Sequence, residues 1–292
     1  MKDFIFIIPL TPSHLQSAFR KELFKITIAS LINQKSDNWQ AILVGEYEKT
    51  DGNLIYIPAV SSDSEYKKYF RKDERFTDKH FKIDIALQYI KSQTVKPKFL
   101  LRFDDDDIIS PTAISEITDF NFDCYADRYQ ALLDTITGKI CLGNYSWLAN
   151  TVIHKYQHAV TIIPDQGRAY QPEGALINGR HNVAFHEYYA HKKILYSSKY
   201  HPLYLRTLTM DSISINNRED NLKYFQWIKS YGTGWYYHRL AEFEPYISEI
   251  LNLSSEYFKV KPKRDFSAFG YMKNFAVDNF NKYFNVVKSK MN

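Results

Sequence analysis

The first 119 residues alternate between short, continuous apolar runs and longer segments in which apolar residues recur every three or four positions. The runs predict buried strands, because a parallel strand covered on both faces reads as a continuous hydrophobic segment. They span residues 4–8, 39–44, 54–57 and 98–103. Helical spacing at 20–33 and 79–91 predicts amphipathic helices, and a further helix is expected from Pro111 to Asp119. Strands that alternate with helices predict an α/β fold with a mainly parallel central sheet.

Beyond residue 120 the apolar pattern is less regular. We expect strands at 152–153 and 159–163, a loop or hairpin at 170–180, and helices at 219–231, 240–258 and 269–288. In the first part, residues 61–78 are polar, charged and aromatic, and we interpret them as a loop or short helix. This pattern predicts one large domain over residues 1–240, followed by a helical C-terminal extension over residues 241–292.

Four consecutive aspartates, Asp104–Asp107, follow the predicted strand at 98–103. Like charges this close disfavour joint ionisation, and a divalent cation such as Mg²⁺ or Mn²⁺ relieves the repulsion through oxygen ligands. In an extended chain Asp104 and Asp106 would point one way and Asp105 and Asp107 the other. A solvated acidic turn is the alternative interpretation, but the apolar residues on both sides of the aspartates argue against it.

The aspartates share a predicted sheet edge with Glu46, which follows the strand at 39–44. In open α/β sheets, ligands bind beyond the carboxyl ends of the strands. We therefore expect Glu46 and the aspartates to border one crevice.

Composition narrows the class of protein only modestly. The chain has 292 residues, 45% of them hydrophobic, so it is long and apolar enough to bury a sizeable core. A net charge of +5 suits anionic ligands or an anionic membrane surface, and it is too weak to favour nucleic acid. The two cysteines, Cys124 and Cys141, lack metal-type spacing and indicate a reducing compartment. We find no secretory leader and no apolar run of about 18 residues, and we expect a cytoplasmic protein.

Several motifs resemble the opening of GT-A glycosyltransferases, particularly the large family-two type. The matching residues are Ile7-Ile8-Pro9, Ser30-Leu31-Ile32-Asn33-Gln34 and Asn38 to Val44. The aspartates look like the Asp-x-Asp motif of that family, with Asp104 and Asp106 in its two positions. The run from Arg102 to Ser110 more closely resembles a bacterial subgroup of rhamnosyltransferases, and Pro202 to Thr207 is similar to its Pro-x-Trp-Leu element.

The resemblance implies a metal-dependent, inverting transfer of a sugar, rhamnose in that subgroup, from a nucleotide-diphosphate donor. The acceptor would be a glycan or a lipid-linked molecule in bacterial polysaccharide biosynthesis. Residues 1–119 would form the nucleotide-sugar-binding half of a catalytic domain, and residues 120–240 the acceptor half. A Mn²⁺ or Mg²⁺ ion would be held by Asp104 and Asp106. The implied donor-binding residues are Pro9, Glu46, Arg75, Lys79, Arg102, Asp104 and Asp105, and Arg71 is a further candidate.

The general base must be sought downstream, on the acceptor side, and Glu187, Asp211 and Glu173 are the candidates. Two positions depart from the family pattern. Glu46 stands where the family places an aspartate that holds the base or ribose, and the histidine expected near residue 210 is missing. Asp211 or His201 would then have to provide the third metal ligand.

Four histidines lie close together in the second half of the chain. They lack the His-x-x-x-His spacing of a helical zinc site, and we interpret them as acceptor-site or structural residues. They are His181, His186, His191 and His201.

Two further questions stay open at the level of sequence. The segment 269–288 mixes aromatic residues with lysines, so it predicts either a helix packed on the domain or peripheral contact with the inner face of a membrane. An aspartate cluster also suits a metal-dependent phosphoryl-transfer enzyme, although the chain lacks a Gly-x-x-x-x-Gly-Lys-Ser phosphate loop. A non-catalytic carbohydrate-binding module on the same fold is the third alternative.

Overall fold

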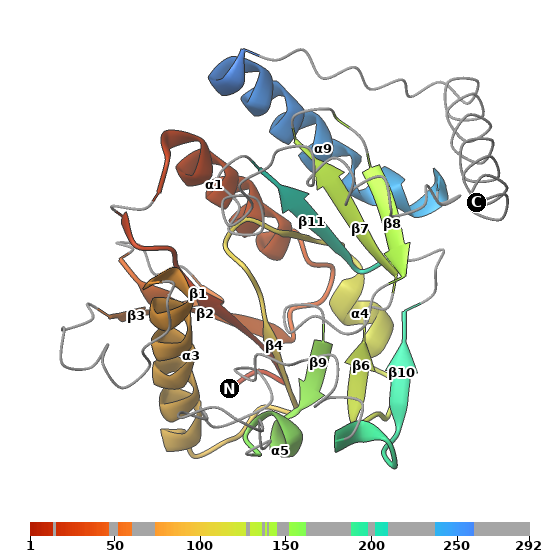
Figure 1. Ribbon diagram of the computed structural model, residues 1–292. Coiled ribbons are helices and arrows are strands. Elements are labelled where there is room, and N and C mark those ends of the chain that lie inside the picture. The colour runs from red at the N-terminus through yellow and green to blue at the C-terminus, as the bar shows by residue number, and fades with distance from the viewer. Residues whose placement is uncertain are drawn as a thin grey trace, which may run out of the picture.

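The computed structural model describes residues 1–13, 16–46, 52–59, 74–126, 129–135, 138, 140–144, 152–161, 188–197, 202–209 and 237–259. These residues form a mixed α/β fold in which helices cover a large central sheet and a smaller sheet lies beside it (Figure 1).

The central sheet has seven strands in the order β10-β6-β9-β4-β1-β2-β3. Their bounds are Phe4–Pro9 (β1), Trp39–Gly45 (β2), Leu54–Pro58 (β3), Phe99–Arg102 (β4), Cys124–Ala126 (β6), Val152–Lys155 (β9) and Ile194–Tyr196 (β10). The pairings are parallel except those of β9, which runs antiparallel to β4 and β6. The prediction of an α/β fold with a mainly parallel sheet is confirmed.

Helices cover both faces of this sheet because side chains alternate along its strands. Ile5 and Ile7 of β1 share a core cluster with Ile83 of α3, whereas Phe6 and Ile8 share another cluster with residues of α1 and α4. The described helices are α1 (Ala18–Ile32), α3 (Glu74–Ser92), α4 (Ala113–Ile117), α5 (Tyr156–Ala159) and α9 (Tyr237–Phe258). The central strand β1 is consequently buried on both faces.

A second, four-stranded sheet lies beside the first in the order β5-β11-β7-β8 (Figure 1). Its strands are β5 (Ile108–Ile109), β7 (Tyr129–Asp134), β8 (Ile140–Asn144) and β11 (Tyr204–Leu208). A third core cluster joins this sheet to α1 and α9 through residues such as Phe19, Leu205 and Phe243. The helix α1 thus contacts the central sheet on one side and the smaller sheet on the other.

The helix α9 confirms the helix expected at 240–258 and packs into the body of the fold. Oε2 of Glu242 accepts hydrogen bonds from Ser110 Oγ at 2.6 Å and Thr112 Oγ1 at 3.1 Å. Asn33, the C-cap residue of α1, donates to Tyr246 Oη at 2.9 Å. The division of the chain at residues 240 and 241 remains a prediction, and α9 extends across that boundary.

Some elements differ from the sequence-based expectations. The strand expected at 159–163 is wrong over its described part, because Ala159 ends the short helix α5. That helix begins where Tyr156 N donates to Lys98 O at 2.7 Å, which turns the chain away from the sheet. The helix expected from Pro111 to Asp119 is confined to the five residues of α4. The segments 170–180, 219–231 and 269–288 lie outside the described residues, as does most of 61–78.

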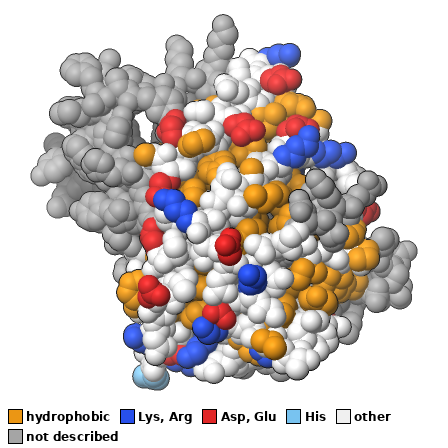
Figure 2. Space-filling view, turned by 180° about the vertical axis from the view of Figure 1, so that it is seen from behind, with side chains coloured by type: hydrophobic (Ala, Val, Ile, Leu, Met, Phe, Trp, Pro, Cys, Tyr) orange, Lys and Arg blue, Asp and Glu red, His pale blue; other side chains and the backbone are white. Residues whose placement is uncertain are grey.

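Figure 2 views the molecule from the side opposite to Figure 1. Acidic and basic side chains are interspersed across the coloured part of this face, with apolar side chains between them. Among the described residues, none of the helices combines the length and the hydropathy needed to cross a bilayer.

Candidate functional site

The four aspartates form a turn at the carboxyl end of β4. The strand ends at Arg102, and Asp107 N donates to Asp104 O at 3.3 Å, which closes the turn. Carboxylate oxygens of Asp104, Asp106 and Asp107 consequently lie within 4.8 Å of one another. The predicted alternation along an extended chain is wrong here, since Asp107 joins the first pair and only Asp105 is directed elsewhere. We call residues 104–107 the aspartate turn.

Asp105 connects the aspartate turn to the loop after β1 and to α1. Its Oδ2 accepts a hydrogen bond from Thr11 N at 2.7 Å, and its Oδ1 pairs with Arg20 Nη2 at 2.8 Å. The same Arg20 nitrogen lies 3.2 Å from Asp106 Oδ2. Ser17 caps α1 by accepting from Arg20 N, which fixes the first turn of the helix beside the aspartates. Arg20 is therefore a bridge between neighbouring carboxylates.

The charges of the aspartate turn raise the pKa of Arg20. Burial by itself would lower this pKa, but the attraction of Asp106 and Asp105 outweighs burial. Arg20 is a permanent cation within the site.

Asp104 is held by two other basic side chains. Nζ of Lys79, on α3, lies 2.6 Å from Asp104 Oδ1, and Nε of Arg102 lies 3.5 Å from the same oxygen. Burial by itself would raise the pKa of Asp104, but attraction to Lys79 and Arg102 outweighs it and lowers that pKa. Burial also lowers the pKa of Lys79, and the charge of Arg102 acts in the same direction.

The pKa values of Asp106 and Asp107 are shifted in the opposite direction. Burial raises the pKa of Asp106. The charge of Arg20 opposes this shift, and the charges of Asp105 and Asp104 add to it. Burial and the charge of Asp106 raise the pKa of Asp107 well above its ordinary value. Both carboxyl groups therefore favour the arrival of positive charge, whether a proton or a metal ion.

Asp107 also ties the turn to the smaller sheet. Its Oδ1 accepts a hydrogen bond from Thr207 N at 3.0 Å, and its Oδ2 accepts one from Tyr204 Oη at 2.5 Å. Thr207 Oγ1 in turn donates to the backbone carbonyl of Asp106. These contacts place β11 against the aspartates and bring the basic side chain of Arg206 close enough to attract Asp104 and Asp107.

The far end of α1 fixes the segment that follows the aspartate turn. Ser30 Oγ accepts from Ile109 N at 3.3 Å, and Gln34 Nε2 donates to Ser110 O at 2.7 Å. Gln34 Oε1 accepts from Ile114 N at 3.3 Å. Ser30 and Gln34 are the two polar residues of the Ser-Leu-x-x-Gln pattern found in the sequence. Their described role is to hold the backbone between β5 and α4.

A divalent cation fits the aspartate turn. Ligands on opposite sides of Mg²⁺ lie about 4.2 Å apart, so three oxygens within 4.8 Å need only small adjustments to share an ion. Carboxylates are the oxygen ligands that Mg²⁺ and Mn²⁺ prefer. The predicted ligands Asp104 and Asp106 are brought together, and Asp107 is a third that sequence reasoning did not select. Metal binding itself remains a prediction.

The ends of β1 and β2 form the part of the central sheet's carboxyl edge that lies next to the aspartate turn. Pro9 pairs in register with Val44, and Leu10 N donates to Val44 O at 2.9 Å. Lys82 Nζ donates to Leu10 O at 2.6 Å and pairs with Asp78 Oδ2 at 2.8 Å, and both side chains are buried. The ion pair lies within α3, and the hydrogen bond from Lys82 to Leu10 O attaches this helix to the segment that follows β1.

Gly45 ends β2 in a conformation with a φ of 144°, and a Cβ at this position would lie 2.9 Å from Leu10 Cβ. Backbone strain and this close contact together predict that Gly45→Ala lowers the free energy of unfolding by about 2–3 kcal/mol. Gly52→Ala is the matched control, because Gly52 also has a positive φ of 49° but open space around it. We expect Gly52→Ala to cost about 1 kcal/mol. Urea unfolding of both variants measures the difference, and equal losses would rule out the steric contribution.

The structure describes only some of the predicted site residues. Glu46 directly follows Gly45 and is exposed at the edge, and Arg102 ends β4 with its side chain buried. His191 is exposed. Arg75 lies on α3, but its side chain is outside the described part of the structure. The remaining candidates lie outside the described residues altogether: Arg71, Glu173, His181, His186, Glu187, His201 and Asp211.

Sequence reasoning did not select Arg20, Lys82 or Tyr204 for this site, and it did not place Asp107 among the possible metal ligands. A signal existed for the two basic ones. Arg20 and Lys82 are charged residues on helix faces that are otherwise buried, and a charge in that position requires a partner. The roles of Asp107 and Tyr204 depend on pairing between distant strands, which no local pattern reveals.

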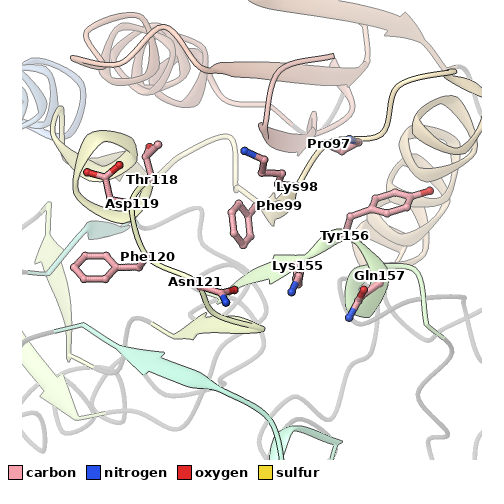
Figure 3. A pocket seen from close by; sticks show the side chains of 10 residues that line it. All are labelled: Pro97, Lys98, Phe99, Thr118, Asp119, Phe120, Asn121, Lys155, Tyr156 and Gln157. Carbon is pink, nitrogen blue, oxygen red and sulfur yellow. The ribbon is translucent and has the colours of Figure 1, made fainter.

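A separate surface hollow lies at the opposite end of β4 from the aspartates (Figure 3). It has a volume of about 480 Å³ and is bordered by the start of β4, the loop after α4 and the junction of β9 with α5. Phe120 at its rim is 56% exposed. Its position separates it from the aspartate turn, so the two are distinct features of the fold.

Comparisons with known proteins reveal only distant structural likenesses. No protein-family model matches the chain, and no curated protein sequence matches it. Residues 1–349 of TarS from S. aureus, in complex with UDP-GlcNAc, have a TM-score of 0.44 and 13% identity, covering 88% of this chain and 73% of that one.

Two other solved structures show a likeness of similar extent. The glycosyltransferase GlyE of Streptococcus pneumoniae TIGR4 has a TM-score of 0.39 and 10% identity, covering 91% of this chain and 66% of that one. The inositol-1-phosphate CTP transferase from T. maritima has a TM-score of 0.40 and 9% identity, covering 80% of this chain and 98% of that one. Since all three TM-scores are below 0.5, the proposals below rest on the residues of this site.

Proposed function

We propose that the chain is a metal-dependent glycosyltransferase of the GT-A type that uses a nucleotide-sugar donor. The observation that carries this proposal is the convergence of Asp104, Asp106 and Asp107 at the carboxyl end of a central parallel strand, with basic side chains around them. Such an edge is where α/β sheets bind ligands. The motifs that resemble the family-two enzymes add the expectation of sugar transfer with inversion.

The described residues suit a diphosphate leaving group. Asp104 and Asp106 would hold the divalent ion, and the bound ion would stabilise negative charge that develops on the diphosphate. Lys79 and Arg102 lie on the same side of the turn and offer ammonium and guanidinium donors to phosphate oxygens. Nε of Arg102 is buried and finds no hydrogen-bond partner within the described part of the chain, so an anionic ligand would satisfy it.

The general base, the donor sugar and the acceptor also belong to the proposal, although the candidate bases lie outside the described residues. The acceptor hydroxyl needs a general base, and we retain Glu187 and Asp211 as its candidates. Rhamnose as the donor sugar and a glycan or lipid-linked acceptor follow from the resemblance. Peripheral contact with the inner face of a membrane follows from the aromatic residues and lysines of segment 269–288. Glu46 would accept hydrogen bonds from the base or ribose, next to Pro9 at the end of β1.

Thermal unfolding with nucleotides tests the donor site directly. The protein would be heated with UDP, GDP, dTDP and their sugars, each with and without Mn²⁺. A ligand present at about 100 times its dissociation constant contributes about 2.7 kcal/mol, which raises the Tm of a chain of 292 residues by roughly 4–5 °C. We expect one nucleotide to do so only when Mn²⁺ is present. Unchanged Tm values with every nucleotide would contradict the proposal.

The same carboxylates also fit a phosphoryl-transfer enzyme, because clusters of aspartates hold the metal ions of such sites. Product analysis separates the two reactions. With a nucleotide sugar as substrate, sugar transfer breaks the bond between the sugar and the diphosphate and releases an intact nucleoside diphosphate. Attack on a phosphorus atom instead breaks the diphosphate link and releases a nucleoside monophosphate or a sugar phosphate. Nucleotide binding without turnover of any acceptor would favour the third alternative, a binding module on the same fold.

A further inference from the structure

Lys79 occupies the carboxylate that a metal ion would need. Its Nζ lies 2.6 Å from Oδ1 of Asp104, a residue of the three-carboxylate cluster. The side chains of Lys79 and Asp104 are 17% and 18% exposed, so the pair is shielded but remains in contact with solvent. At this separation the ammonium is the strongest single neutraliser of Asp104.

Basic side chains already surround the aspartate turn without a metal ion. Among the described residues, the basic groups that act on its carboxylates are Arg20, Lys79, Arg102 and Arg206. A divalent ion that approached the carboxylates would be repelled by these positive charges. Entry is therefore easier when a basic group moves away or an anion arrives with the metal.

Lys79 is the basic group best suited to move. Arg20 is held by Asp105, Asp106 and Thr11, so its displacement would break several contacts at once. Arg102 belongs to β4 and has little freedom at its backbone. Lys79 reaches the site on a flexible four-carbon stem from α3, and its ammonium can rotate toward a new oxygen partner.

We propose that Lys79 is an internal counter-ion. In the ligand-free protein its ammonium group pairs with Asp104, and when the metal ion binds it moves to a phosphate group of the donor. The inference rests on the proposed function, because it assumes that the aspartate turn is a metal site. Lys79 would contact the donor directly in this scheme. Its positive charge weakens the binding of a divalent ion alone. Binding of the metal ion together with the diphosphate is therefore favoured over binding of the ion by itself.

Binding of Mn²⁺ alone tests this role without any transfer reaction. The free Mn²⁺ signal in electron paramagnetic resonance would be titrated with the wild-type protein and with Lys79→Met. Loss of a positive charge a few ångströms from the ion should tighten Mn²⁺ binding about tenfold or more. Lys79→Arg keeps the charge and should bind Mn²⁺ as the wild type does.

Lys98→Met is the matched control, because Lys98 also forms a 2.7 Å ion pair, with Asp3, but lies at the opposite end of β4 from the aspartates. We expect it to bind Mn²⁺ with unchanged affinity. Lys79→Gln provides a second uncharged variant, and thermal unfolding checks that each variant is folded.

The possible outcomes separate the two proposals. Equal Mn²⁺ affinity in the wild type and in both uncharged Lys79 variants would overturn the role of Lys79 while leaving the metal site in place. No Mn²⁺ binding by any variant would overturn the metal site and the counter-ion role together. Tighter binding by the uncharged variants alone supports the inference.

Discussion

Replacing Asp106 with asparagine is expected to lower sugar transfer about 10²–10³-fold while the protein stays folded. Asparagine keeps the shape of the side chain but offers a neutral amide oxygen in place of a carboxylate, so the site loses one negative ligand of the proposed metal ion. Arg20 keeps its partner Asp105 in this variant, which preserves the link between α1 and the turn. Transfer rates and thermal unfolding, measured on the same preparation, separate the two effects.

Asp119→Asn is the control for this substitution. Asp119 follows α4 and is exposed, so the same chemical change takes place far from the carboxylate cluster. We expect its transfer rate and Tm to match those of the wild type. An Asp106→Asn protein with full activity would show that the aspartate turn does not hold a catalytic metal ion.

The second large effect is expected for stability. Arg20→Met should lower the free energy of unfolding by about 3–5 kcal/mol, because it leaves shielded carboxylates of Asp105 and Asp106 without their shared cation. The Arg20 and Asp105 side chains are only 11% and 8% exposed, so water replaces the lost partner poorly. Urea unfolding gives the difference directly.

Lys25→Met provides a comparison within the same helix. Lys25 pairs with Glu22 at 2.7 Å, but its side chain is 71% exposed, and such surface pairs contribute about 0–1 kcal/mol. We expect the Lys25 variant to unfold at nearly the wild-type urea concentration. Similar losses in both variants would mean that Arg20 contributes no more than an ordinary surface ion pair.

The first half of the fold could be predicted because its signals are local. Buried parallel strands read as apolar runs, and the runs at 4–8, 39–44, 54–57 and 98–103 agree with β1 to β4 within one or two residues. The aspartates were recognisable since four charges follow directly on such a run. Each of these features depends on residues that are neighbours in the sequence.

The second half could not be predicted to the same extent, because its strands are short and their partners are distant. The strand β6 has three residues, and β11 pairs with β5 and β7 from about 100 and 75 positions away. The segment around Ala159 contains several apolar residues and resembles a strand, yet the chain turns there into α5.

The geometry of the site also depends on distant parts of the chain and could not be predicted from local sequence. The sequence placed Asp104 and Asp106 together by assuming an extended chain, and the structure brings them together through a turn. That difference explains why Asp107 was assigned to the wrong side. The partners of the turn, Arg20 and Tyr204, are 85 and 97 positions away from the aspartates that they contact, so only the tertiary fold identifies them.

Aspartate side chains, and not other peptide groups, hold two backbone amides at the edges of the site. Thr11 N donates to Asp105 Oδ2, and Thr207 N donates to Asp107 Oδ1. Exchange of an amide proton with deuterated water requires its hydrogen bond to open. The exchange rates of these two amides therefore report separately on the two flanks of the aspartate turn, one toward the first strand and one toward the smaller sheet. A spectroscopist thus has an intrinsic probe at each flank, without any label.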